Sequence, residues 1–148
     1  MNPAPLDHAA IAARVPHAGS MCLLATCTAW SAETIHCTAT GHADPAHPLR
    51  TAGGLLSVNA IEYASQAMAL HGTLSAPPGS PPTPGFLASV RAVVLHVPRL
   101  DDVPGALQVH ATKLAGDARQ AAYQFVLNDE AGRALVEGRA TVILDALP

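Results

Sequence analysis

Three polar residues, Asn59, Glu62 and Gln66, interrupt an otherwise apolar stretch and could carry acid–base chemistry. Spacings of three and four residues place their side chains on one stripe of a helix. A carboxylate such as that of Glu62 is costly to bury unless it is paired or functional. The stripe is therefore either the solvated edge of the helix or a functional face, with Glu62 as its acid or base, that borders a cleft.

Two histidines precede this stretch, in the proline-framed segment 41–50 (GHADPAHPLR). His42 and His47 are each candidates for a general base, although single histidines of this kind are commonly structural or simply exposed. Backbone N–H groups where a helix begins, here after Gly53 and Gly54, can stabilise an oxyanion. A base, a second acid–base group and an oxyanion donor together suit proton abstraction next to a carbonyl group.

The elements that must position these residues form one predicted α+β domain over residues 1–148. Residues 55–74 are apolar on nearly every side, through Leu55, Val58, Ile61, Met68, Leu70 and interleaved alanines, which predicts a long buried helix. A short helix capped by Asp7 is predicted over 7–14, and a proline-rich loop over 76–85. Six runs have strand character: 21–30, 34–40, 86–97, 106–114, 121–128 and 133–144. The first two runs predict a hairpin and the last four, which are consecutive, an antiparallel meander. We therefore expect an antiparallel sheet wrapped around the single long helix.

The composition is unusually poor in charge. Hydrophobic residues make up 49% of the 148 residues and charged residues only 13%, with a formal net charge of −3. An ordinary domain has about 25% charged residues. These values exclude a disordered chain and argue against a basic nucleic-acid-binding surface. They also indicate that part of the outer surface is buried against a partner subunit.

Several other kinds of site are not expected. The chain has no apolar run of the length of a membrane span and does not begin like a signal peptide, so a cytoplasmic protein without a membrane segment is expected. The three cysteines form no CxxC pair, so they are expected in the core and neither as zinc ligands nor in disulfides. Tyr63 is expected to pack in the core, and four further histidines to be structural or exposed: His36, His71, His96 and His110.

A set of motifs along the chain resembles those of a known enzyme family. The motifs are Pro16-His17 before an apolar strand, Gly41-His42-x-x-Pro45-x-x-Pro48, and the segment IEYASQA at 61–67. They are similar, in the same order, to motifs of hotdog-fold 3-hydroxyacyl-[acyl-carrier-protein] dehydratases. The similarity covers nearly the whole chain and is greatest to the short dehydratase-like proteins of bacterial aryl polyene pigment clusters.

The resemblance implies dehydration of a 3-hydroxyacyl thioester, carried on the phosphopantetheine arm of an acyl carrier protein, to the trans-2-enoyl thioester. His42 would remove the C2 proton, and Glu62 of a partner subunit would help the 3-hydroxyl group leave, without a metal or redox cofactor. His47 is the alternative base, since the loop lacks the family's Pro-Gly and His47 lies closer to the helix. His17, Gly54 and Gln66 would bind or orient the substrate, and a backbone N–H near Gly54 or Leu56 would bind the oxyanion.

Other functions and partners stay open at this point. The chain could be a hotdog acyl thioesterase that uses Glu62 as the base for water. It could also be a non-catalytic hotdog subunit that assists a related dehydratase. The partner subunit would be a second copy or a related hotdog chain. Because carrier proteins are acidic, Arg50, Arg91 and Arg99 are candidate contacts for the acyl carrier protein.

Overall fold

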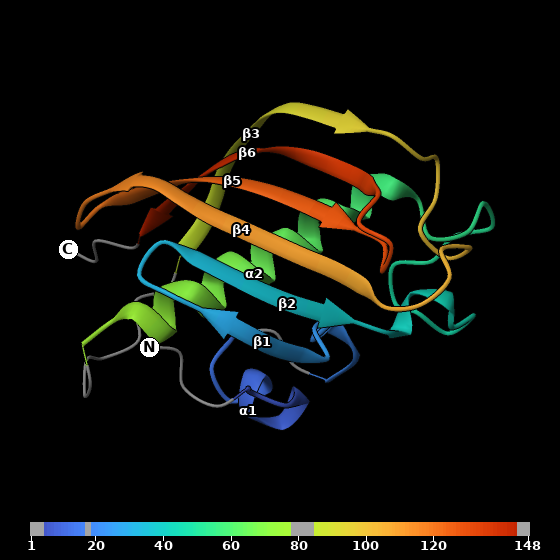
Figure 1. Ribbon diagram of the computed structural model, residues 1–148, viewed down its shortest axis with the longest axis horizontal. Helices are drawn as coiled ribbons and strands as arrows, with labels where there is room; N and C mark the ends of the chain where they lie inside the picture. The colour runs from blue at the N-terminus through green and yellow to red at the C-terminus, as the bar shows by residue number, and fades with distance from the viewer. Residues whose placement is uncertain (1–4, 17–18, 78–84, 145–148) are drawn as a thin grey trace.

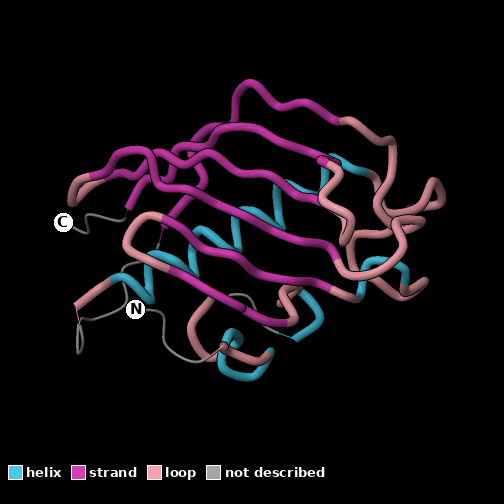
Figure 2. Tube along the Cα trace, viewed as in Figure 1, coloured by secondary structure: helices cyan, strands magenta, loops and turns pink. Residues whose placement is uncertain are grey.

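The fold is an antiparallel sheet that curves around one long helix, as a computed structural model of residues 5–16, 19–77 and 85–144 shows (Figures 1 and 2). In chain order, the helices and strands of these residues are α1 (His8–Ala12), β1 (Thr26–Trp30), β2 (Thr34–Ala39), α2 (Ala60–Ser75), β3 (Gly85–Leu95), β4 (Leu107–Gly116), β5 (Gln120–Asn128) and β6 (Ala134–Leu144). Short 3₁₀ turns cover Gly19–Met21, Gly41–Ala43 and Ser57–Asn59.

The strands are arranged in the order β1-β2-β4-β5-β6-β3, and every neighbouring pair is antiparallel. The first two strands form the predicted hairpin. The predicted four-strand meander is confirmed for β4, β5 and β6 but is wrong for β3, which pairs with β6 and not with β4. Helix α2 connects β2 to β3, which is the edge strand on the far side of the meander (Figure 1). The predicted α+β class and the hotdog arrangement are confirmed.

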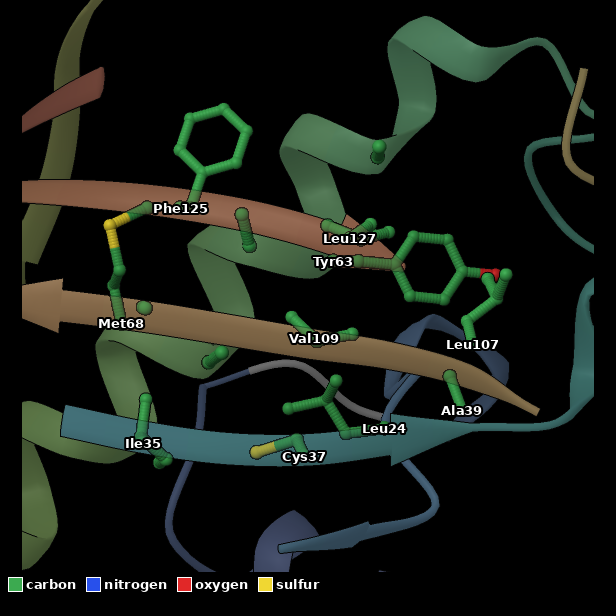
Figure 3. Packing of buried hydrophobic residues seen from close by; sticks show 14 of the residues in the cluster. Leu24, Ile35, Cys37, Ala39, Tyr63, Met68, Leu107, Val109, Phe125 and Leu127 are labelled. Atoms are coloured by element: carbon green, nitrogen blue, oxygen red, sulfur yellow. The ribbon is translucent and has the colours of Figure 1, made fainter. Parts of the chain in front are cut away.

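The core lies between α2 and the inner face of the sheet (Figure 3). The helix packs mainly against β2, β4 and β5, where alternate strand residues point inward because side chains of a strand alternate between its faces. Ala60, Ala64 and Ala67 are fully buried on the helix, and their small side chains let it lie close to the strands. The three cysteines are buried, as predicted, and none is in a disulfide in the described structure.

Two predicted boundaries differ from the structure, and both differences arise from long-range hydrogen bonds. Strand β1 begins at Thr26 and not at residue 21, because the side chain of Gln66 binds backbone groups of Met21 and Leu23. Helix α2 begins at Ala60 and not at residue 55, because the chain before it is held extended against residues 98–100. Val58 therefore lies in a 3₁₀ turn with half of its surface exposed, at 50%.

The N-terminal segment protects one edge of the sheet. Leu6 exchanges two backbone hydrogen bonds with Cys27 of β1, each 2.9 Å long. Helix α1 follows, and the carboxylate of Asp7 accepts the N–H of Ala10 at 2.9 Å, so the predicted cap is confirmed. Backbone groups of β1 that would otherwise face water are thus paired within the chain.

Candidate active site

His42 lies in the 3₁₀ turn directly after β2 and is almost completely buried. Its Nε2 lies 2.9 Å from the carbonyl oxygen of Val103, in the connection between β3 and β4. Because a carbonyl oxygen only accepts, Nε2 carries the proton, which leaves Nδ1 of the neutral ring with a lone pair. This buried Nδ1 has no hydrogen-bond partner among the described residues. The ring is therefore held at one nitrogen, while the other has no partner in the described part of the chain.

His47 is held at both of its nitrogens. Nδ1 accepts the backbone N–H of Leu49 at 3.1 Å, so the ring proton lies on Nε2, which is 2.9 Å from the hydroxyl oxygen of Tyr63. Burial lowers the pKa of His47 below its usual 6.5, and the charge of Arg50 acts in the same direction, while the charge of Asp44 opposes both. His47 is thus a neutral hydrogen-bonded link between the loop and helix α2.

Glu62 lies in the first turn of α2 and is held by Gln66, one helical turn further along. The Gln66 amide nitrogen donates to the Glu62 carboxylate at 3.1 Å and to the carbonyl of Met21 at 2.7 Å, while its oxygen accepts the N–H of Leu23 at 2.8 Å. Gln66 is fully buried, so the interpretation of this stripe as a solvated helix edge is wrong for Gln66. Its amide orients the carboxylate and joins it to the segment before β1.

Gly54 does not offer its N–H to a substrate, which corrects one of the predicted oxyanion donors. That N–H donates to the carbonyl of Thr51 at 2.9 Å. The N–H of Leu56, in contrast, has no acceptor within the part of the chain that the structure describes. Leu56 lies opposite Arg99 in an isolated β-bridge. The residues on either side of these two make the hydrogen bonds of the bridge, so the N–H of Leu56 points away from Arg99.

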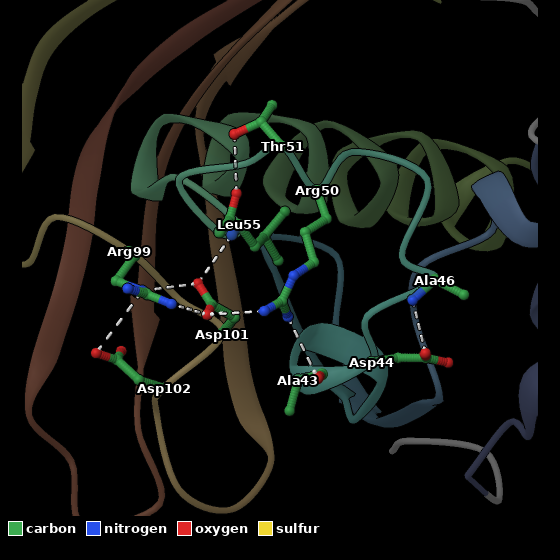
Figure 4. Close-up of polar contacts among 10 residues, drawn as sticks. Ala43, Asp44, Ala46, Arg50, Thr51, Leu55, Arg99, Asp101 and Asp102 are labelled. Atoms are coloured by element: carbon green, nitrogen blue, oxygen red, sulfur yellow. Dashed lines mark hydrogen bonds and ion pairs between the residues drawn. The ribbon is translucent and has the colours of Figure 1, made fainter.

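Asp101 joins the segments on both sides of Gly54 (Figure 4). Its carboxylate accepts the N–H of Leu55 at 2.8 Å, binds the guanidinium of Arg99, and lies 3.6 Å from that of Arg50. The hydrogen bond from Arg99 lowers the pKa of Asp101 well below its usual 3.8. Gly54 has φ of +96°, and a Cβ atom there would lie 2.5 Å from an Asp101 oxygen. Glycine is required here because the carboxylate packs directly against the backbone.

The structure brings the predicted residues to one region but through partners that the sequence did not reveal. The loop after β2, the start of α2 and the connection between β3 and β4 meet at one end of the sheet (Figure 1). The Val103 carbonyl, the Tyr63 hydroxyl and Asp101 were not predicted to take part. Of these, only Asp101 could have been noticed in the sequence, because two adjacent acidic residues, 101 and 102, follow closely after Arg99. His17, a predicted substrate contact, lies outside the described residues.

Neither a metal centre nor a membrane-spanning helix is found in the described part of the chain. Across residues 5–16, 19–77 and 85–144, no group of three or more His, Cys, Asp or Glu residues is placed to hold a metal ion. No helix within these ranges is both long and apolar enough to cross a bilayer.

Solved structures with the same fold include dehydratases and thioesterases. The dehydratase heterocomplex ApeI:P of Xenorhabdus doucetiae is similar with a TM-score of 0.77 and 24% identity, over 91% of this chain and 90% of that one. A thioesterase of Haemophilus influenzae is similar with a TM-score of 0.61 and 16% identity, over 80% and 76% of the two chains. A mutant thioesterase of Pseudomonas aeruginosa gives a TM-score of 0.61 and 12% identity, over 84% and 82%.

A family assignment comes from the sequence match. No curated protein sequence matches the chain significantly. Residues 9–146, nearly the full length, match the ApeP dehydratase family, which is described as ApeP-like. This match confirms the resemblance to dehydratases that the motifs at 16–17, 41–48 and 61–67 indicated. The chain therefore belongs to the ApeP-like family of dehydratases.

Proposed function

We propose that this dehydratase acts on 3-hydroxyacyl thioesters carried by an acyl carrier protein and forms trans-2-enoyl thioesters, in the synthesis of fatty acid or aryl polyene-type chains. The observation that carries the proposal is the state of His42. Its Nε2 is bound to the Val103 carbonyl, and its buried Nδ1 has a lone pair without a partner among the described residues. A neutral, oriented imidazole of this kind is suited to remove a weakly acidic proton.

The reaction follows from this assignment. His42 takes the C2 proton, and the electron pair of the C2–H bond forms the C2=C3 double bond as the C3–O bond breaks. The departing hydroxyl group takes a proton from a carboxyl group of the partner subunit, Glu62 where the partner is a second copy, and leaves as water. General acid–base catalysis contributes about 10²–10⁴-fold to such a step. No redox cofactor is needed, because the loss of water causes no net oxidation or reduction of the substrate, and no metal is part of the proposed mechanism.

The thioester oxygen gains negative charge in the transition state, and we assign the Leu56 N–H to it. This N–H has no acceptor among the described residues and lies just before the 3₁₀ turn that leads into α2. A donor placed where an oxyanion develops contributes about 10²–10³-fold. The exposed side chains of Leu56 and Val58 beside it, at 42% and 50%, are apolar surface for an acyl chain or a partner subunit.

A second subunit completes the site in this proposal. Glu62 is anchored through Gln66 to the segment before β1, whereas His42 is anchored to the connection between β3 and β4. The two groups are thus anchored to different segments, and the family resemblance implies that the base of one chain acts with the carboxylate of another. The partner is a second copy or a related hotdog chain, and the heterocomplex of Xenorhabdus doucetiae supports the second form. The complex would act in the cytoplasm, with Arg50, Arg91 or Arg99 contacting the carrier protein.

The test is a dehydration assay with a defined substrate. Purified protein, alone and mixed with a related hotdog chain, is incubated with a 3-hydroxyacyl carrier protein, and loss of water is followed by intact-protein mass spectrometry. We expect His42→Ala and Glu62→Gln each to lower the rate by about 10²-fold or more. Unchanged rates in both variants would overturn the site assignment. Activity only in the mixture, with both variants of this chain still fully active, would instead identify it as an assisting subunit.

The same assay separates dehydration from thioester hydrolysis. A thioesterase would release the free acid and regenerate the unacylated carrier protein, without an unsaturated product. Two solved thioesterases share the fold, but at 16% and 12% identity they support the fold alone. We therefore expect the enoyl carrier protein as the product.

A further inference from the structure

Asp101 carries a nearly buried charge in the connection between β3 and β4. Its side chain is exposed by only 4%, whereas most aspartates face water. The carboxylate accepts hydrogen bonds from the guanidinium of Arg99 and lies 3.6 Å from that of Arg50 (Figure 4). The whole chain has only 8 lysines and arginines, and two of them converge on this one group. A buried ion pair is weak evidence for stability, because desolvation offsets the attraction, so a second role for Asp101 has to be considered.

On one side, Asp101 holds the backbone that precedes the Leu56 N–H. Leu55 is fixed at both of its polar backbone groups, because its carbonyl accepts the N–H of Leu100 at 2.7 Å and its N–H donates to the Asp101 carboxylate at 2.8 Å. The Leu55 carbonyl and the Leu56 N–H belong to one planar trans peptide unit, in which they point in opposite directions. These two contacts therefore determine the direction of the Leu56 N–H.

On the other side, two short chains of contacts lead from Asp101 to His42. Asp101 lies in a turn that ends at Val103, whose carbonyl binds Nε2 of His42 at 2.9 Å. The second chain of contacts passes through Arg50, which also donates to the carbonyl of Ala43 at 3.4 Å. Ala43 directly follows His42 in the same 3₁₀ turn. A displacement of the Asp101 carboxylate would thus be transmitted to the ring of His42 as well as to the peptide before Leu56.

We propose that Asp101 is a positioning residue of the dehydratase, which sets the orientation of the His42 ring and of the Leu56 N–H together. It touches neither reacting group and acts through Leu55, Val103 and Arg50. A misplacement of about 1 Å in a catalytic group can lower a rate by about 10²-fold, so a shared anchor of two such groups has a large effect on the rate. The inference rests on the proposed function, because it takes the roles of His42 and Leu56 from there.

Three variants separate positioning from a purely structural ion pair. Asp101→Ala removes the acceptor of the Leu55 N–H and the partner of both arginines. Asp101→Asn keeps an oxygen for the Leu55 N–H but loses the charge, so its effect should be smaller. The matched control is Asp102→Asn, which removes the same charge from the next residue; that side chain is exposed by 65% and lies 4.0 Å from Arg99.

The first measurement is steady-state kinetics with a 3-hydroxyacyl carrier protein, with the related hotdog chain present. We expect kcat per folded molecule to fall by about 10²-fold in Asp101→Ala, with little change in KM, because the orientation matters mainly in the transition state. Asp102→Asn should retain the wild-type kcat. Circular dichroism gives the folded fraction of each variant, and Asp101→Asn carries the test if Asp101→Ala does not fold.

The second measurement is the tautomer of His42, which does not depend on activity. NMR of the ring nitrogens at mildly alkaline pH, where histidine is ordinarily neutral, distinguishes protonated from unprotonated imidazole nitrogens. The signals of His42 are identified by their loss in His42→Ala. We expect wild type and Asp102→Asn to have the proton on Nε2 alone, and Asp101→Ala to show both tautomers. A structural role alone would lower the folded fraction and leave the tautomer of the folded molecules unchanged.

The outcomes distinguish this inference from the proposed function. A single unchanged tautomer in both Asp101 variants would overturn the joint positioning role, as would a kcat equal to that of Asp102→Asn. If kcat is unchanged in Asp101→Ala while His42→Ala abolishes dehydration, the positioning role is wrong and the proposed function stands. If His42→Ala has no effect on the rate, the proposed function fails, and the NMR comparison still decides whether Asp101 orients this ring.

Discussion

His47 and Tyr63 form a fixed pair, in which Nε2 of the histidine donates to the tyrosine hydroxyl across 2.9 Å. The other ring nitrogen is bound by the N–H of Leu49, so His47 has no free lone pair. His42, five residues earlier, differs because its Nδ1 lacks a partner in the described structure. Two histidines that are equivalent as residue types therefore have different chemistry.

Replacing each histidine should separate their roles. We expect His47→Gln to retain kcat within about tenfold, because the glutamine amide can still donate to Tyr63, whereas His42→Ala should lower kcat by about 10²–10⁴-fold. Steady-state kinetics with a 3-hydroxyacyl carrier protein and the partner subunit measures both. If His47→Gln abolishes activity and His42→Ala does not, His47 is the base.

Gly54 should tolerate no side chain. Gly54→Ala forces a non-glycine residue to φ of +96° and places a Cβ atom 2.5 Å from the Asp101 carboxylate. We expect a loss of about 1–3 kcal/mol in the free energy of unfolding, measured by urea denaturation. The neighbouring Gly53→Ala is the control, because its closest atom would be 3.7 Å away. A Gly54→Ala protein as stable as Gly53→Ala would contradict this account.

Gln66 should matter for both stability and rate. Gln66→Leu keeps the side-chain volume but removes the partners of the half-buried Leu23 N–H and Met21 carbonyl. An unpaired group costs about 1–3 kcal/mol when it is fully buried, so we expect a smaller loss for each of these two groups. The Glu62 carboxylate also loses the amide that orients it, so kcat should fall more than KM changes. Gln124→Leu, on the exposed face of β5, is the control and should leave both quantities near wild type.

Acid should destabilise the protein through its buried histidines. Burial lowers the pKa values of His47, His71 and His110 below the usual 6.5. At pH well above 6.5 these histidines are neutral in both the folded and the unfolded chain, so their contribution to the free energy of unfolding is fully present. As the pH falls, the unfolded chain takes up protons first, and stability declines by at most about 1.4 kcal/mol per pH unit for each histidine.

Denaturant titrations between pH 7.5 and pH 4.5 can measure how the free energy of unfolding changes with pH. This slope reports the protons taken up on unfolding, at most about one per histidine. His71 accepts from the Tyr123 hydroxyl at 2.7 Å and donates to the Ser31 carbonyl at 2.8 Å, so its neutral form is fully bonded. His71→Gln should therefore reduce the slope while lowering stability at neutral pH. A slope equal to that of wild type would show that His71 does not contribute.

The order and type of the elements follow from the sequence, because they depend on local patterns. The apolar surface of residues 55–74 indicated the central helix, and the consecutive runs after residue 85 indicated four strands, although only the last three form the meander. The Asp7 cap and the spacing of Glu62 and Gln66, four residues apart, also required only local geometry, and both contacts are present. The motifs around these residues were sufficient to indicate the family.

The state of each functional group was decided only by the tertiary structure, since the deciding partners are distant in the chain. The Val103 carbonyl that orients His42 is 61 residues away, and Asp101 reaches Leu55 from 46 residues away. Likewise, two bulges determine that Arg91 faces Arg139, and a shift of one residue would move a side chain to the other face of the sheet. Hydrophobic pattern determines which segments pair and become buried, but hydrogen bonding and register determine what the buried groups can do.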